Sequence, residues 1–147
     1  MSACGQSTAF KMMLSTFYDS DFPTILPEEL AGLQNPLLLD TREKKEFAVS
    51  HLKGATYVGY EHFSLVNILE KDKSRPIIVY CSIGVRSQDI GKKLKAAGFT
   101  QVYNLYGGIF HWVNEGNPVF QGNKPTKKVH AYNRTWGIWL TEGEKVY

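Results

Sequence analysis

The sequence of 147 residues contains few cysteines and no long apolar run. Its two cysteines, Cys4 and Cys81, are too few for a disulfide framework, and their different surroundings make a bridge between them unexpected. No apolar run approaches the about 18 residues that a transmembrane helix requires, so we expect no membrane span. Hydrophobic residues make up 43% and charged residues 21%, a balance typical of one globular domain with an ordinary core.

Basic charge is present but is not concentrated. The formal net charge is +3, and the densest basic cluster is Lys124, Lys127 and Lys128. No basic stripe interleaved with aromatic residues accompanies this cluster, so we expect a solvated face there and no nucleic-acid partner. The four histidines are dispersed and lack the spacing of metal ligands, so the sequence implies no metal and no cofactor.

Short apolar runs alternate with helical patterns through most of the chain. The predicted strands are 24–25, 36–40, 55–58, 77–80 and 101–105. The predicted helices are one opened by Pro27 and four more at 43–49, 63–71, 86–97 and 108–115. This alternation predicts an α/β fold with three layers, in which helices cover both faces of a mainly parallel central sheet. We expect an N-terminal arm at 1–21, a domain at 22–119, and an extension at 120–147 that packs on the domain.

Cys81 stands at the end of the strongest predicted strand, 77–80, and directly before a predicted helix. In an open parallel sheet, ligands bind beyond the carboxyl ends of the strands. The turn over 82–87 is tight enough to curl backbone N–H groups inward, and Gly84 permits a positive φ angle there. The helix that begins near Arg86 adds its positive dipole end, which favours the thiolate. These features predict a nucleophilic Cys81 at the floor of an anion cradle.

Four motifs occur in order along the chain: LLDTR at 38–42 with EF at 46–47, SHLKGA at 50–55, VYC at 79–81 with the loop to Arg86, and LYGGI at 105–109 with Trp112. Together they resemble the rhodanese (thiosulfate sulfurtransferase) superfamily in its single-domain form. The resemblance covers about residues 25–119 and implies a rhodanese-like three-layer fold. The segments 1–21 and 120–147 match no motif of the family.

The resemblance also implies an activity and a set of site residues. Sulfane sulfur would move from thiosulfate or a related small sulfur anion to Cys81 as a persulfide, and then to a thiol, cyanide or a protein thiol. The substrate-binding cradle would consist of Ser82, Ile83, Gly84, Val85, Arg86 and Ser87. Arg42 would contribute to anion binding, and Asp40 would be a structural partner near the loop. We expect a monomer.

Two other function classes stay open. Phosphatases with a Cys-x5-Arg loop, some of which share this fold, place their arginine six positions after the cysteine, whereas Arg86 lies five after Cys81. A phosphate needs the wider ring, so loop length favours sulfur over a phosphatase or an arsenate reductase. Non-enzymatic modules of this fold, which bind a partner or sense sulfur, often lack the cysteine that this chain retains. Trp136 and Trp139 are candidates for a partner surface or for packing anchors.

Residues 2–5, with the sequence SACG, permit two interpretations. They resemble the end of a bacterial lipoprotein signal, in which a cysteine after small residues is lipidated, although nothing apolar precedes Cys4. Alternatively, Cys4 is an incidental residue of a disordered start. The first interpretation predicts a location in the cell envelope or periplasm, and the second predicts the cytoplasm.

Overall fold

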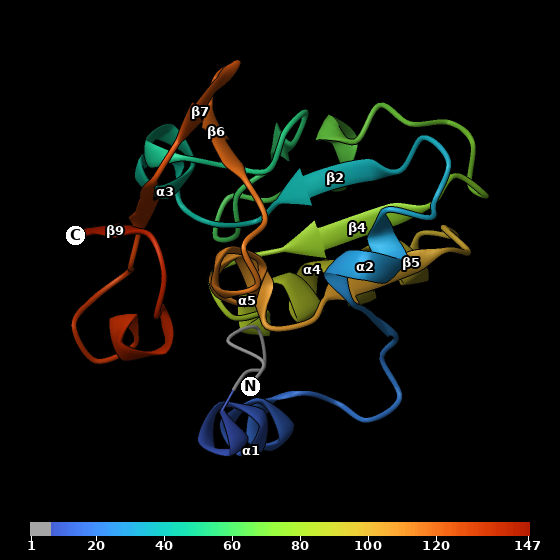
Figure 1. The fold of residues 1–147 in the computed structure, drawn as a ribbon. Coiled ribbons are helices and arrows are strands. Elements are labelled where there is room, and N and C mark those ends of the chain that lie inside the picture. The colour runs from blue at the N-terminus through green and yellow to red at the C-terminus, as the bar shows by residue number, and fades with distance from the viewer. Residues whose placement is uncertain (1–6) are drawn as a thin grey trace.

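The computed structural model describes residues 7–147, and a five-stranded parallel sheet forms its centre (Figure 1). Its strands are β1 (Thr24–Ile25), β2 (Leu37–Asp40), β3 (Thr56–Tyr57), β4 (Ile77–Tyr80) and β5 (Val102–Leu105). They lie in the order β1-β5-β4-β2-β3, and every neighbouring pair runs parallel. The α/β fold with a mainly parallel sheet is therefore confirmed.

The strand β4 lies in the middle of the sheet because its apolar residues can be buried on both faces. Ile77 and Val79 pack in one core cluster, whereas Ile78 and Tyr80 pack in the other. The helix α4 (Val85–Ala96) covers the first face, and α2 (Pro27–Leu30) and α5 (Gly108–Asn114) cover the second (Figure 1). These helices, α3 (Lys44–Val49) and all five strands agree with the predicted elements to within one or two residues.

The predicted helix at 63–71 is wrong. This segment contains only a 3-10 turn, η1 (Leu65–Asn67), and the side chains of Leu65 and Leu69 are 42% and 85% exposed. Phe63 and Ile68 are the residues of this segment that pack against the core. Because a short helix is stabilised mainly by burial of a continuous apolar face, a segment that buries two side chains does not form one.

The N-terminal arm contains a helix that the sequence did not predict, α1 (Thr8–Phe17). Ser7 is its N-cap, and the Ser7 hydroxyl accepts a hydrogen bond from the N–H of Phe10 at 3.1 Å. Phe10 and Leu14 are spaced four residues apart and are buried in the core cluster that includes Tyr80. Cys4 and the lipoprotein prediction lie outside the described residues.

The C-terminal extension also packs on the domain. It contains an antiparallel hairpin of β6 (Val119–Gln121) and β7 (Lys124–Thr126), a parallel pair of β8 (Lys128–His130) and β9 (Glu144–Val146), and a 3-10 turn, η2 (Gly137–Trp139). Val129, Ala131 and Leu140 are buried in the same cluster as α5. Figure 1 shows the extension on the left, the side toward which β2 and β4 point.

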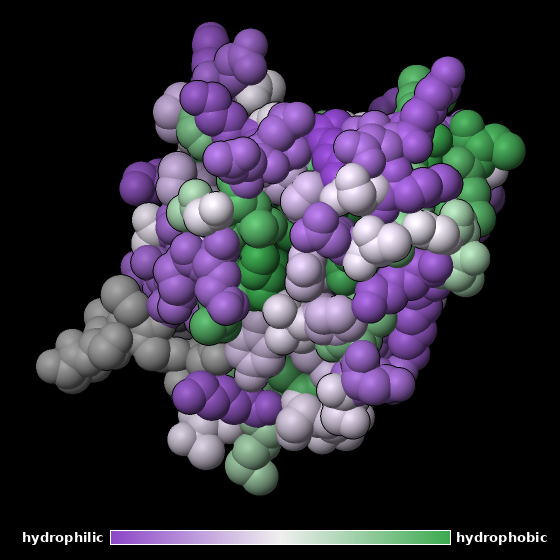
Figure 2. Space-filling view, turned by 90° about the vertical axis from the view of Figure 1, so that its right-hand side faces the viewer, coloured by the Kyte–Doolittle hydropathy of each residue, from purple (hydrophilic) through white to green (hydrophobic). Residues whose placement is uncertain are grey.

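The two ends of the chain meet through aromatic contacts. Phe10 stacks on Trp139 with ring centroids 5.3 Å apart, and Phe17 meets Trp136 edge-on at 5.9 Å. The opposite side of the molecule, where the strands begin, is mainly hydrophilic, with hydrophobic groups near its centre and toward its upper right (Figure 2). Over residues 7–147, no helix is both long and apolar enough to cross a membrane.

Candidate active site

Cys81 follows the last residue of β4 and is a free, buried cysteine. The chain turns through three residues and enters α4 at Val85, so Cys81 lies below the amino end of this helix. The backbone N–H of Gly84 donates a hydrogen bond to Cys81 Sγ at 3.1 Å. Gly84 has a φ of +102°, and a Cβ atom there would overlap the hydroxyl of Tyr18. Glycine is therefore required both for the turn and for the space beside it.

A short polar chain fixes the loop to the neighbouring strand. The hydroxyl of Ser87 lies 3.5 Å from Cys81 Sγ and donates to Asn104 Oδ1 at 2.6 Å. The amide of Asn104 in turn donates to the carbonyl of Gly84 at 2.8 Å. All these groups are buried, so the hydrogen bonds hold the loop and α4 in a defined position relative to β5.

Arg86 is the cation of the loop, and it is paired with Glu46 of α3. Its guanidinium donates to both carboxylate oxygens, at 2.9 and 3.1 Å, and to the Ser82 hydroxyl at 3.0 Å. Burial alone would raise the pKa of Glu46, but the hydrogen bonds and charge of Arg86 outweigh it and lower the pKa. Burial likewise disfavours the charged form of Arg86, but Glu46 and the nearby Cys81 raise its pKa. The pair is therefore ionised on both sides at neutral pH.

Tyr18, directly after α1, holds the loop from the other side. Its hydroxyl donates to the carbonyl of Ile83 and accepts a hydrogen bond from the N–H of Gly107 at 3.0 Å. Burial raises the pKa of Tyr18 far above its ordinary value, so the side chain remains a neutral phenol that can donate. Tyr18 could not be predicted as a site residue, because a lone tyrosine in an aperiodic arm carries no signal of its partners.

Asp40 and Arg42 lie together as an ion pair. They form a fully buried ion pair at 2.7 Å, and Arg42 also donates to the carbonyl of Ser50 at 2.6 Å. The backbone N–H of Arg42 donates to Asp40 as well, at 3.0 Å. Neither side chain lines the cavity at Cys81. The structure thus directs the guanidinium of Arg42 toward Asp40 and the turn after α3.

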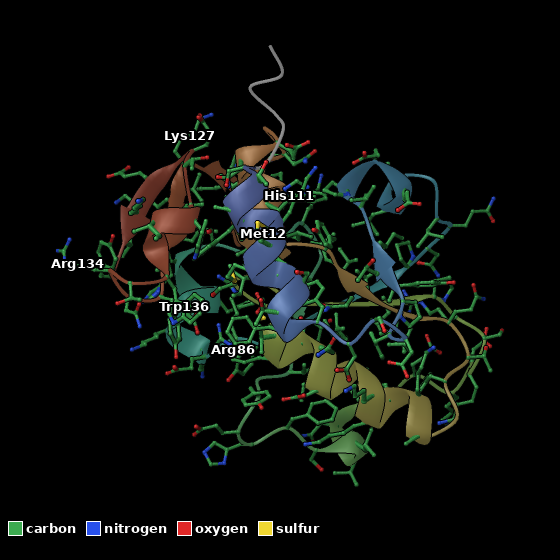
Figure 3. The ribbon with its side chains drawn as sticks, turned by 90° about the horizontal axis from the view of Figure 1, so that it is seen from below. Met12, Arg86, His111, Lys127, Arg134 and Trp136 are labelled. Atoms are coloured by element: carbon green, nitrogen blue, oxygen red, sulfur yellow. The ribbon has the colours of Figure 1, made fainter. Side chains whose placement is uncertain are left out.

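A cavity of about 190 Å³ opens at Cys81. Four loop residues line it together with the cysteine: Ser82, Ile83, Val85 and Arg86. The rest of its wall comes from outside the predicted domain: Phe17, Tyr132 and Trp136. Figure 3 shows Arg86 and Trp136 beside one another next to α1. From the sequence, Trp136 is predicted only as part of a partner surface or as a packing anchor, and neither Phe17 nor Tyr132 is predicted at the site.

Comparison with known proteins identifies a family model and several relatives that this chain resembles. The family model of the rhodanese-like domain matches residues 26–115, which is more than half of the chain. The chain is similar to thiosulfate sulfurtransferase GlpE of Coxiella burnetii, with 30% identity over 100 residues that cover 65% of this chain and 88% of the relative. It is also similar to a sulfurtransferase of Allochromatium vinosum, with 32% identity over 94 residues that cover 64% and 87%.

Solved structures share the fold. A rhodanese-related protein of Thermoplasma volcanium has a TM-score of 0.61 and 25% identity, covering 68% of this chain and 99% of that protein. A thiosulfate sulfurtransferase of Pseudomonas aeruginosa has a TM-score of 0.65 and 24% identity, covering 78% of this chain and 23% of that protein. The matched region 26–115 includes all four sequence motifs and the loop at Cys81. The chain belongs to the rhodanese-like domain family.

Proposed function

We propose that this protein is a sulfurtransferase that carries sulfane sulfur as a persulfide on Cys81. The observation that supports this most directly is the hydrogen bond from the Gly84 N–H to Cys81 Sγ, at the amino end of α4. A backbone donor and a helix dipole both favour the thiolate, which is the nucleophilic form of cysteine. Relatives named sulfurtransferases, at about a third identity, agree with this chemistry.

In the first step, the thiolate of Cys81 attacks the outer sulfur of thiosulfate or a related donor. The bond between the two donor sulfurs breaks, sulfite leaves with the electron pair, and the new S–S bond makes Cys81 a persulfide anion. No proton is transferred, so no general base is required. The loop residues 82–87 are proposed to bind the donor and then the persulfide, with backbone N–H groups facing the negative charge.

In the second step, a nucleophilic acceptor takes the terminal sulfur and regenerates the Cys81 thiolate. Cyanide would leave as thiocyanate, and a small thiol or a protein thiol would leave as a persulfide. Division of one transfer into two displacements is the advantage of a covalent intermediate. Asp40 and Arg42 would act by fixing the turn beside the loop, since their charges are satisfied by each other.

The test is thiocyanate formation from thiosulfate and cyanide by the full chain, by Cys81→Ser and by the matched control Cys4→Ser. Loss of the nucleophile should reduce kcat/KM at least about a thousandfold, whereas Cys4→Ser should retain it. Equal turnover by wild type and Cys81→Ser would contradict the proposal. Hydrolysis of an aryl phosphate that depends on Cys81, without any thiocyanate, would favour the phosphatase class instead.

A further inference from the structure

We propose that the aromatic wall of Phe17, Tyr132 and Trp136 makes this site selective for sulfur compounds with a small apolar body, aromatic ones above all. This inference rests on the sulfur transfer proposed above and specifies the class of substrate. Three observations support it: the charge balance of the site, the origin and geometry of the wall, and the volume of the cavity.

The charge of the site does not match an inorganic dianion well. Among the residues that line the cavity, the one cation is Arg86, and it is paired through two hydrogen bonds with the fully buried carboxylate of Glu46. The pair is neutral overall. Thiosulfate would bring two negative charges next to the Cys81 thiolate, and the neutral pair offers no net positive charge to offset them. A donor with one negative charge and an apolar body meets less repulsion.

The wall that faces this pair is aromatic. Phe17 from α1 meets Trp136 from the C-terminal extension edge-on at 5.9 Å, and the ring of Tyr132 lies 5.0 Å from the Arg86 guanidinium carbon. Tyr132 has a φ of +71°, which residues with a side chain adopt rarely. The N–H of Tyr132 donates to the ring of His130 at 3.0 Å, which holds this conformation. Such outliers concentrate at functional sites, and this one lies at the cavity wall.

The volume sets the size of the ligand. At about 190 Å³ the cavity is smaller than the roughly 300–1,000 Å³ of pockets that bury drug-sized ligands. An organic body about the size of one ring therefore fits in the cavity against the aromatic side chains, with its sulfane sulfur at Cys81. An organic thiosulfonate, R–SO2–S⁻, meets this description. Attack by the Cys81 thiolate on its outer sulfur breaks the S–S bond, and the electron pair leaves with the sulfinate R–SO2⁻.

The first experiment compares benzenethiosulfonate with methanethiosulfonate as donors to the full chain, with cyanide as acceptor. The two probes carry the same charge and the same reacting group, so they differ mainly in the body that meets the wall. We expect kcat/KM to favour the benzene compound by about tenfold, since an added aromatic contact contributes on that order. Trp136→Ala should reduce this ratio below about threefold. The matched control is Ile138→Ala, which changes an exposed residue nearby in the sequence and should preserve the ratio.

A second pair of variants covers the case in which Trp136→Ala does not fold. Phe17→Ala should lower the same ratio from the other side of the cavity, and Met12→Ala, on the exposed part of α1, should not. Figure 3 shows Met12 on α1, apart from Trp136 of this wall. A wild-type ratio near one, or a ratio that Trp136→Ala and Phe17→Ala leave unchanged, would overturn the inference.

Binding of unreactive analogues separates this inference from the proposed function. Calorimetry of the full chain with benzenesulfonate and with methanesulfonate, which carry the same charge, should show about tenfold tighter binding of benzenesulfonate, and Phe17→Ala should reduce the difference. This result would support the selective wall even if no donor formed a persulfide. The absence of a persulfide would contradict only the proposed sulfur transfer. Equal affinity for the two anions would overturn the selective wall and leave the sulfur transfer to be judged by turnover.

Discussion

Replacement of Tyr18 by phenylalanine tests how the loop at Cys81 is held. The variant keeps the ring and removes only the hydroxyl, which donates to the carbonyl of Ile83 and accepts from the N–H of Gly107. Both partners are backbone groups, one in the loop that follows Cys81 and one at the start of α5. The hydroxyl is therefore a bridge between two elements that approach each other at the site.

The expected loss of stability follows from the two groups left without a partner. An unsatisfied polar group in a buried environment costs about 1–3 kcal/mol, so two cost roughly 2–4 kcal/mol when partial hydration is allowed for. For a domain of this size, each kcal/mol lowers Tm by about 2–4 °C, which predicts a Tm roughly 5–15 °C lower. The loop would also be held less firmly, so kcat/KM for sulfur transfer should fall about 10- to 100-fold.

Urea unfolding and the thiocyanate assay measure both effects. The matched control is Tyr60→Phe, because the hydroxyl of Tyr60 donates to Asp89 at the exposed surface at 2.7 Å. This surface contact should cost less than about 1 kcal/mol and leave turnover unchanged. Suppose that the free energy of unfolding of Tyr18→Phe lay within about 0.5 kcal/mol of the wild-type value and that its turnover were equally fast. That result would refute the idea that the hydroxyl holds the loop.

Two further variants test the ion pair and the close approach of α5. Glu46→Gln should cost roughly 2–4 kcal/mol at pH 7, because Arg86 then lacks a charged partner. Since the pKa of Glu46 is lowered in the folded protein, its stabilising effect is present above the unfolded pKa of about 4.3 and disappears as pH falls through the lower folded value. Urea titrations of both proteins should therefore converge in acid; a constant difference would contradict the ion pair. Gly108→Ala should abolish stable folding or turnover, because its Cβ would come within 2.6 Å of the Cys81 carbonyl oxygen at a φ of +61°. Gly98→Ala, at a φ of +103° but with open space around its Cβ, should cost only about 1 kcal/mol, and similar losses of stability in both variants in a thermal melt would contradict the steric explanation.

The fold was predictable because its signals are local. The apolar run at 77–80 and the alternation of strands with helices identify the central strand and the layers around it. The same run places Cys81 at a strand end before a helix, and the structure brings the loop 82–87 around its sulfur. The helical pattern at 63–71 misled because only Phe63 and Ile68 pack against the core, whereas Leu65 and Leu69 are exposed.

The wall of the site was not predictable from local patterns. Phe17 and Trp136 are more than a hundred residues apart in the sequence, and only the packing of both chain ends on the domain brings them together at the cavity. The arm shows no clean periodicity, although Phe10 and Leu14 anchor a helix there. Arg42 illustrates the converse. The sequence predicts an arginine near the loop, but only the structure shows that Asp40 and Ser50 accept hydrogen bonds from its Nε and Nη2.

The most direct test of the proposed chemistry is the intact mass of the protein after incubation with a sulfane-sulfur donor and removal of the excess. The proposal predicts a gain of about 32 Da, one sulfur atom, that maps to the peptide containing Cys81 and is lost on addition of cyanide. Cys81→Ala should show no gain under the same conditions. Absence of the added mass with thiosulfate, with an organic thiosulfonate and with polysulfide, or its appearance unchanged in Cys81→Ala, would contradict a persulfide at this cysteine.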